Sequence, residues 1–202
     1  MRITDIKQQV KNKDRYSVYV DGDYAFSLSA DELVAQKIAS NQEITKEQLE
    51  TLIKTAVEDK AYQAAIDLIA RRPRSIWEMQ QYLARKQYDQ PIITKILNKL
   101  ISRGLLNDKA FAEAWVQNRQ LLKPTSRRKL QQELQQKNIS KSIISEVLAD
   151  YEDAEQNALK ALVEKKRPLP RYQDQSKLMA YLVRQGFSYG DIKAALSDSP
   201  ED

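Results

Sequence analysis

Residues 75–97, SIWEMQQYLARKQYDQPIITKIL, align without gaps on residues 126–148, SRRKLQQELQQKNISKSIISEVL. A third segment, QDQSKLMAYLVRQGFSYGDIKAAL (173–196), aligns on both, with Leu178 opposite Met79. Four apolar positions recur at helical spacing in all three segments: Met79, Leu130 and Leu178; Leu83, Leu134 and Leu182; Ile93, Ile144 and Ile192; Leu97, Leu148 and Leu196. A pattern that repeats at this period indicates tandem units that share one core design.

The residues between the apolar positions predict where each helix stops and the next one starts. Left-handed positions at the end of the first helix of each segment are expected at Gln87, Asn138 and Gly186. The next helix is expected to be N-capped by Asp89, Ser140 and Ser188. A further apolar-periodic helix precedes each segment, and Asp108 is expected to cap the one that opens the second unit. Each unit therefore has three helices with a helix-turn-helix-like end.

The first 28 residues read differently, as short runs rich in Val, Ile, Tyr and Phe that predict strands. Turn-forming residues 11–14 and 21–23 separate these runs, and capping-box pairs follow at Ser29 with Glu32 and at Thr45 with Gln48. The predicted fold is mainly α: a small N-terminal antiparallel β meander followed by a tandem array of three three-helix repeats. The expected divisions are residues 1–44 (meander plus short helix), 45–107, 108–149 and 150–202 (repeats 1 to 3).

Residues that are missing from the chain exclude several classes of protein. Without His or Cys there is no Ser-His-Asp triad, no Cys-His pair and no zinc site built from these ligands. Four glycines are too few, and too scattered, for a glycine-rich phosphate cradle. We therefore expect no enzyme, no cofactor and no metal. No apolar run approaches membrane-spanning length, and the first residues lack the apolar core of a signal peptide. We therefore expect a cytoplasmic protein that does not associate with a membrane.

The net charge of +5 is concentrated in the middle of the chain. Residues 61–107 carry 8 Lys and Arg against 3 Asp and Glu, and residues 108–149 carry 8 against 4, whereas both flanks are mildly acidic. The cations recur around the middle helix of the repeats, which favours an electropositive ridge over a helical surface that is merely rich in Lys and Arg. The expected ridge residues are Arg71, Arg72, Arg74, Arg85, Lys86, Arg119, Lys123, Arg127, Arg128 and Lys129. We also expect the helix N-termini there to help hold phosphates or carboxylates.

Three strings carry a resemblance to a known family. They are RRPRSIWEMQQYLARK (71–86), ILNKLISRGLLNDKAFAEAWVQNR (96–119) and RRKLQQELQQKNIS (127–140). The chain resembles the RecX family, bacterial regulators of the RecA recombinase, over about residues 60–200, and the meander resembles the extension of some longer members. Gln87 and Asn138 stand where the family usually has glycine. The resemblance implies a protein that binds in the groove of the RecA–single-stranded-DNA filament and lowers its ATPase, strand-exchange and coprotease activities.

Two other functions are compatible with the helical repeats. A sequence-specific transcription factor needs a recognition helix with base-reading side chains and usually a dimer, but residues 91–102 and 142–151 are largely apolar. A protein scaffold would bind in a way that depends little on salt. We expect instead a monomer with weak, salt-sensitive and sequence-independent affinity for single- and double-stranded DNA.

Overall fold

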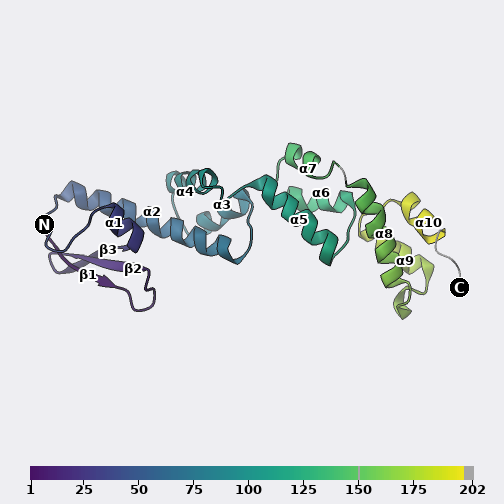
Figure 1. The fold of residues 1–202 in the computed structure, drawn as a ribbon, viewed down its shortest axis with the longest axis horizontal. Coiled ribbons are helices and arrows are strands. Elements are labelled where there is room, and N and C mark those ends of the chain that lie inside the picture. Colours follow the sequence, from purple (N-terminus) through teal and green to yellow (C-terminus); the bar gives the residue numbers. More distant parts are fainter. Residues whose placement is uncertain (150, 198–202) are drawn as a thin grey trace. The chain divides into compact units, whose positions relative to one another are not determined.

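The computed structural model describes residues 1–149 and 151–197 (Figure 1). Residue 150 and residues 198–202, which belong to the expected third repeat, lie outside the described part of the chain. The elements are β1 (Ile3–Gln8), β2 (Arg15–Val20), β3 (Asp23–Ser29), α1 (Ala30–Ala35), α2 (Lys46–Arg71), α3 (Ile76–Arg85), α4 (Gln90–Ser102), α5 (Asp108–Leu122), α6 (Arg127–Gln136), α7 (Lys141–Val147), α8 (Glu152–Lys166), η1 (Pro170–Tyr172), α9 (Gln175–Arg184) and α10 (Tyr189–Ser197). The predicted fold class is confirmed: a mainly helical chain with three three-helix repeats and one small antiparallel sheet.

The chain divides into two compact units, and the division falls inside α3. Unit 1 comprises residues 1–73 and 79–106, and therefore holds the sheet, α1, α2, most of α3 and α4. Unit 2 comprises residues 74–78 and 107–202, and holds the first turn of α3 together with the second and third repeats.

The sheet of unit 1 has the order β1-β2-β3, with both pairs antiparallel. Asp21 and Gly22 connect β2 to β3 with positive φ angles of 51° and 93°, which is the backbone of a two-residue hairpin turn. One face of the sheet is buried against α2, which packs along β3 and begins with the complete capping box of Thr45 and Gln48. A three-stranded sheet is only marginally stable alone, so α2 supplies the apolar surface that it needs.

The apolar positions that the repeat alignment picked out form the cores. All of them are buried except Leu97, which is half-buried, because α4 turns Ile96 and Leu100 inward instead. In unit 2 the second repeat packs α5, α6 and α7 around Leu130 and Leu134, and the third packs α8, α9 and α10 around Leu178 and Leu182.

The turns inside the repeats are also as predicted. Gln87 and Asn138 have φ angles of 62° and 58°, and Gly186 has a φ of 92°. A left-handed residue thus ends the middle helix of every repeat, which lets the chain reverse within a few residues. Ser140 and Ser188 then accept backbone N–H groups of the following helix, whereas Asp89 is the N-cap residue of α4 without a side-chain hydrogen bond to it.

A buried serine links successive middle helices at two places in unit 2. Ser75 Oγ, at the start of α3, donates to the carbonyl of Lys137 at the end of α6 (2.9 Å), and Ser126 Oγ, at the start of α6, donates to the carbonyl of Gln185 at the end of α9 (2.9 Å). Both serines are completely buried, and each also accepts the N–H three residues later. We call each of these contacts a repeat junction. Their recurrence shows that the packing between helices repeats as well as the packing within each repeat.

A carboxylate from the following repeat completes each repeat junction. The N–H of Ile76 donates to Asp108 Oδ1 (2.8 Å), and the N–H of Arg127 donates to Glu155 Oε1 (3.1 Å). The prediction that Asp108 caps its own helix is wrong: Asn107 is the N-cap of α5, and Asp108 instead closes the start of α3. Burial raises the pKa of the Asp108 carboxyl, and the hydrogen bond from Ile76 opposes this rise only in part.

Tyr151 ties the third repeat to the segment that precedes α6, and this predicts a pH dependence of stability. Its buried hydroxyl donates to the carbonyl of Thr125 (3.1 Å), and burial, assisted by the charge of Glu155, raises the pKa of Tyr151 to about 12. The folded state therefore holds this proton more tightly than the unfolded state, whose tyrosine pKa is about 10. The stability that Tyr151 contributes is complete below pH about 10 and is lost as the pH rises towards 12.

The measurement is urea denaturation of the wild type and of Tyr151→Phe between pH 9 and pH 12. We expect the difference between their free energies of unfolding to shrink over this range as Tyr151 loses its proton. The other Lys and Tyr side chains titrate in both proteins and therefore cancel in the difference. A difference that stays constant with pH would show that Tyr151 does not titrate in this way.

Candidate functional site

The ten expected ridge residues fall in both units. Unit 1 holds Arg71 in the last turn of α2, Arg72 at its C-cap, and Arg85 with Lys86 at the end of α3. The other six belong to unit 2: Arg74, Arg119, Lys123, Arg127, Arg128 and Lys129. A single continuous ridge remains a prediction, and the local surroundings separate the residues into different groups.

Arg119 contributes to the core of its own repeat. Its Nε bonds to Glu133 Oε2 at 2.8 Å, and its guanidinium lies 5.0 Å from the centre of the Trp115 ring. Trp115 Nε1 donates to the same carboxylate oxygen at 2.9 Å. These contacts join α5 to α6, so Arg119 has a structural role that its charge alone did not indicate.

Lys129 belongs to the repeat junction. Its ammonium donates to Gln185 Oε1 (2.9 Å), at the place where Glu78 pairs with Lys137 (2.6 Å) in the other repeat junction. Burial, with the positive charges of Lys123 and Arg119 nearby, lowers the pKa of the Lys129 ammonium. Lys129 is therefore less available to a partner than Arg127 and Arg128, which are exposed.

The backbone amides at the helix starts are already bonded. Ile76 and Arg127 donate to Asp108 and Glu155, and the amides two positions further along α3 and α6 donate to the junction serines. We expected these helix N-termini to help hold phosphates or carboxylates. These four amides bind carboxylates and hydroxyls of the chain itself, so they are not available to phosphates. Any anion bound nearby has to be bound by side chains.

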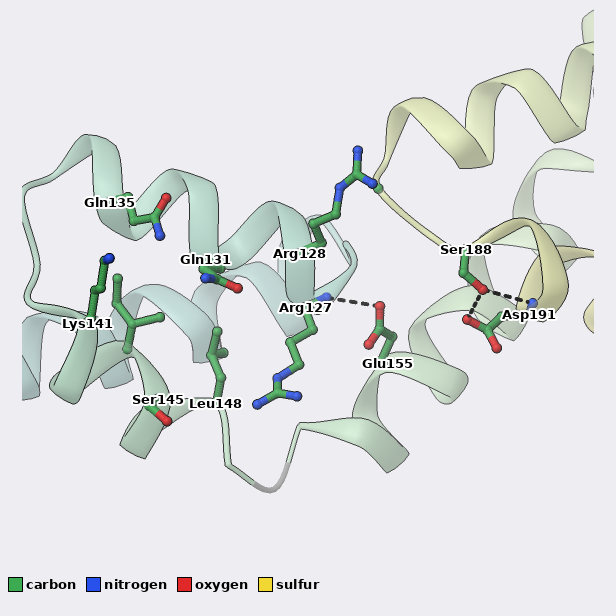
Figure 2. A pocket seen from close by; sticks show the side chains of 12 residues that line it. Arg127, Arg128, Gln131, Gln135, Lys141, Ser145, Leu148, Glu155, Ser188 and Asp191 are labelled. Atoms are coloured by element: carbon green, nitrogen blue, oxygen red, sulfur yellow. Dashed lines mark hydrogen bonds between the residues drawn. The ribbon is translucent and has the colours of Figure 1, made fainter.

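Arg127 and Arg128 do line an open groove of about 590 Å³ on unit 2 (Figure 2). We call it the α6–α7 groove. Figure 2 shows Gln131 and Gln135 following the arginines along α6, with Lys141 beside Gln135 at one end and Glu155, Ser188 and Asp191 at the other. It is lined by Arg127, Arg128, Gln131, Gln135, Lys141, Ile144, Ser145, Leu148, Glu155, Gly186, Ser188 and Asp191.

Sequence reasoning missed the groove residues beyond the two arginines. The available signal was the spacing of four between Arg127, Gln131 and Gln135, which places them on one face of α6. Lys141 was missed because it stands alone in the sequence and reaches the groove only through the turn at Asn138.

Within residues 1–149 and 151–197, no three His, Cys, Asp or Glu side chains come together in a way that could hold a metal ion. None of the helices in these ranges combines the length and apolarity that crossing a membrane requires.

Family models match along most of the chain. They are described as the regulatory protein RecX N-terminal domain (residues 1–45) and the first, second and third three-helix domains of RecX (residues 61–100, 107–148 and 153–196). These ranges cover the sheet and the three repeats described above.

Individual proteins agree with the family models. A protein named regulatory protein RecX from Clostridium botulinum (strain Alaska E43 / Type E3) is 31% identical, over 98% of this chain and 96% of its own length. One from Halalkalibacterium halodurans is 30% identical, over 98% of this chain and 78% of its own length.

Solved structures share the fold. A crystal structure of regulatory protein RecX superposes with a TM-score of 0.72 at 24% identity, covering 98% of this chain and 99% of that one. The crystal structure of RecX from Lactobacillus salivarius gives a TM-score of 0.60 at 26% identity, covering 70% of this chain and 95% of that one. The repeats, the sheet and these similarities, which extend over nearly the whole sequence, place the chain in the RecX family of regulatory proteins.

Proposed function

We propose that this protein regulates the RecA recombinase by binding the filament that RecA forms on single-stranded DNA. Binding lowers the ATPase, strand-exchange and coprotease activities of RecA. The proposal rests on membership of the RecX family and on one observation in the structure, the exposed pair Arg127 and Arg128 at the edge of the α6–α7 groove. Such cations suit a partner that presents both phosphates and acidic side chains.

The proposed mechanism uses binding alone. A protein held along the filament by several charged contacts obstructs the addition of RecA subunits or loosens those already present. The protein acts as a cytoplasmic monomer, and its domains end at residues 44, 107 and 149. In the absence of RecA it binds DNA weakly and without sequence preference. Because charged contacts to phosphates release counterions, this affinity falls steeply as the salt concentration rises.

The test is a titration of the protein into RecA that is hydrolysing ATP on single-stranded DNA. We expect dose-dependent loss of hydrolysis at amounts well below one molecule per RecA subunit, because one molecule on a growing filament affects many subunits. ATP hydrolysis that is unchanged at equimolar protein would contradict the proposed function.

A further inference from the structure

The α6–α7 groove contains hydrogen-bond donors that the protein itself does not use. Among residues 1–149 and 151–197, no hydrogen bond or ion pair engages the side chains of Arg127, Arg128, Gln131, Gln135 or Lys141. Three other cations of the second repeat are ion-paired within the chain: Lys109 with Glu146, Arg119 with Glu133 and Lys137 with Glu78. The cations that line the groove are not used in this way, so a ligand in the groove can bind them.

The type of side chain indicates an anionic ligand that also accepts hydrogen bonds. Arginine and lysine bind phosphate oxygens, and the amides of Gln131 and Gln135 add neutral donors between them. At the other end, Glu155 is engaged with the Arg127 N–H and Asp191 accepts from Ser188. The positive part of the groove therefore runs from the arginines to Lys141.

The shape of the groove favours a strand over an isolated ion. Arg127 and Gln135 are eight residues apart on α6, which corresponds to about 12 Å along the helix axis. A run of this length with cations at both ends accommodates more than one phosphate of a continuous backbone.

The groove offers little to an acidic protein segment or to stacked bases. Its apolar residues, Ile144 and Leu148, are 4% and 2% exposed and so provide no pocket for the apolar anchor that usually stabilises a protein interface. None of the described residues that line it is aromatic, so they offer bases no ring to stack on. Recognition here depends on the sugar-phosphate backbone.

We propose that the α6–α7 groove binds a single strand of nucleic acid through its phosphates. Arg127, Arg128 and Lys141 are the cations, and Gln131 and Gln135 are neutral donors between them. The inference deepens the proposed function, on which it rests, because it assigns the DNA strand of the filament to a defined site on the second repeat. Binding is insensitive to base sequence and weakens with salt.

The test uses the full-length protein without RecA and measures the fluorescence anisotropy of labelled oligothymidylate. The groove variant combines Gln131→Glu and Lys141→Glu, two exposed groove residues whose side chains form no hydrogen bond or ion pair with the described residues. The matched control, Gln132→Glu with Lys160→Glu, changes the net charge equally at exposed positions outside the groove. Circular dichroism verifies that both variants are folded.

We expect the groove variant to lose at least about tenfold in affinity and the control less than about threefold. The slope of log affinity against log salt should fall by about 1 in the groove variant, as expected when one phosphate contact is lost. Equal losses in both variants would overturn the proposal, as would wild-type binding to polyglutamate as tight as to oligothymidylate. The RecA titration, run in parallel with the wild type, reports separately on the proposed function.

Discussion

Replacing Asp59 with alanine is expected to lower the free energy of unfolding by about 3–5 kcal/mol. Asp59 lies on the face of α2 that covers the sheet, and its side chain is 4% exposed. Its Oδ2 accepts hydrogen bonds from Arg15 Nη1 (2.9 Å) and from the Ser29 N–H (2.8 Å), and its Oδ1 accepts one from Ser29 Oγ (2.7 Å). One carboxylate thereby joins β2, the end of β3 and α2.

The cost is large because Arg15 is itself buried. Its guanidinium, 10% exposed, also donates to the carbonyl and hydroxyl of Ser27, which do not neutralise its charge. Without Asp59 a cation stays in a largely dry environment with its counter-charge removed, and two donors of Ser29 lose their acceptor. The loss of one buried partner costs more than the intact pair contributes.

The adjacent residue provides the control. Glu58 forms an ion pair with Lys95 at 2.5 Å, but the Lys95 side chain is 63% exposed. Glu58→Ala is therefore expected to cost less than about 1 kcal/mol. Urea denaturation followed by circular dichroism compares the two variants at pH 7. Similar losses for both would show that the buried pair does not hold α2 to the sheet.

Gly186→Ala is expected to lower the free energy of unfolding by about 2–4 kcal/mol. Gly186 ends α9 with a φ of 92°, where any Cβ is strained. A Cβ at this position would also overlap Ser126 Oγ and lie 3.3 Å from Lys129 Cβ. The repeat junction would have to open to accommodate it, because Ser126 is completely buried.

Gly104→Ala separates the two causes. Gly104 has a φ of 70° and nothing within 4 Å of the position of its Cβ, so only backbone strain of about 1–2 kcal/mol applies. Ser126→Ala removes the overlapping oxygen, so we expect Gly186→Ala to cost less in that background than in the wild type. If Gly186→Ala costs no more than Gly104→Ala, close packing at the repeat junction is not what requires glycine there.

Much of the fold could be predicted from the sequence because its signals are local and occur three times. The spacing of apolar residues predicted the helices. The left-handed turns at Gln87, Asn138 and Gly186 were predicted because these residues occupy the same position in the alignment of the three repeats. Leu97 departs from its column: it is half-buried, and Ile96 and Leu100 are the buried residues of α4 there.

Contacts between repeats could not be predicted in the same way. Nothing in the sequence near Ser75 or Ser126 indicates that their hydroxyls donate to carbonyls 62 and 59 residues away. Asp108 was assigned to the wrong helix for the same reason: a carboxylate beside two helix starts can cap either one.

The candidate site was predicted only in part because charge alone does not distinguish free cations from paired ones. Lys95 with Glu58 and Lys109 with Glu146 are ion pairs with the same separation of 37 residues, yet the signs of the charges are exchanged between the repeats. An alignment of apolar positions ignores such pairs. Arg119 was likewise predicted to belong to the ridge, although its side chain contacts Glu133 and Trp115 of its own repeat.

We propose that exposed cations of the second repeat hold this protein on the RecA filament. The most direct measurement compares two double variants. One combines Arg127→Glu and Arg128→Glu; the control combines Lys160→Glu and Lys193→Glu, which change the net charge equally at exposed positions of the third repeat. Co-sedimentation with preformed RecA–single-stranded-DNA filaments gives the affinity of each. We predict a loss of at least about tenfold for the arginine variant and less than about threefold for the control. Wild-type affinity in the arginine variant, with its helicity intact, would contradict the claim.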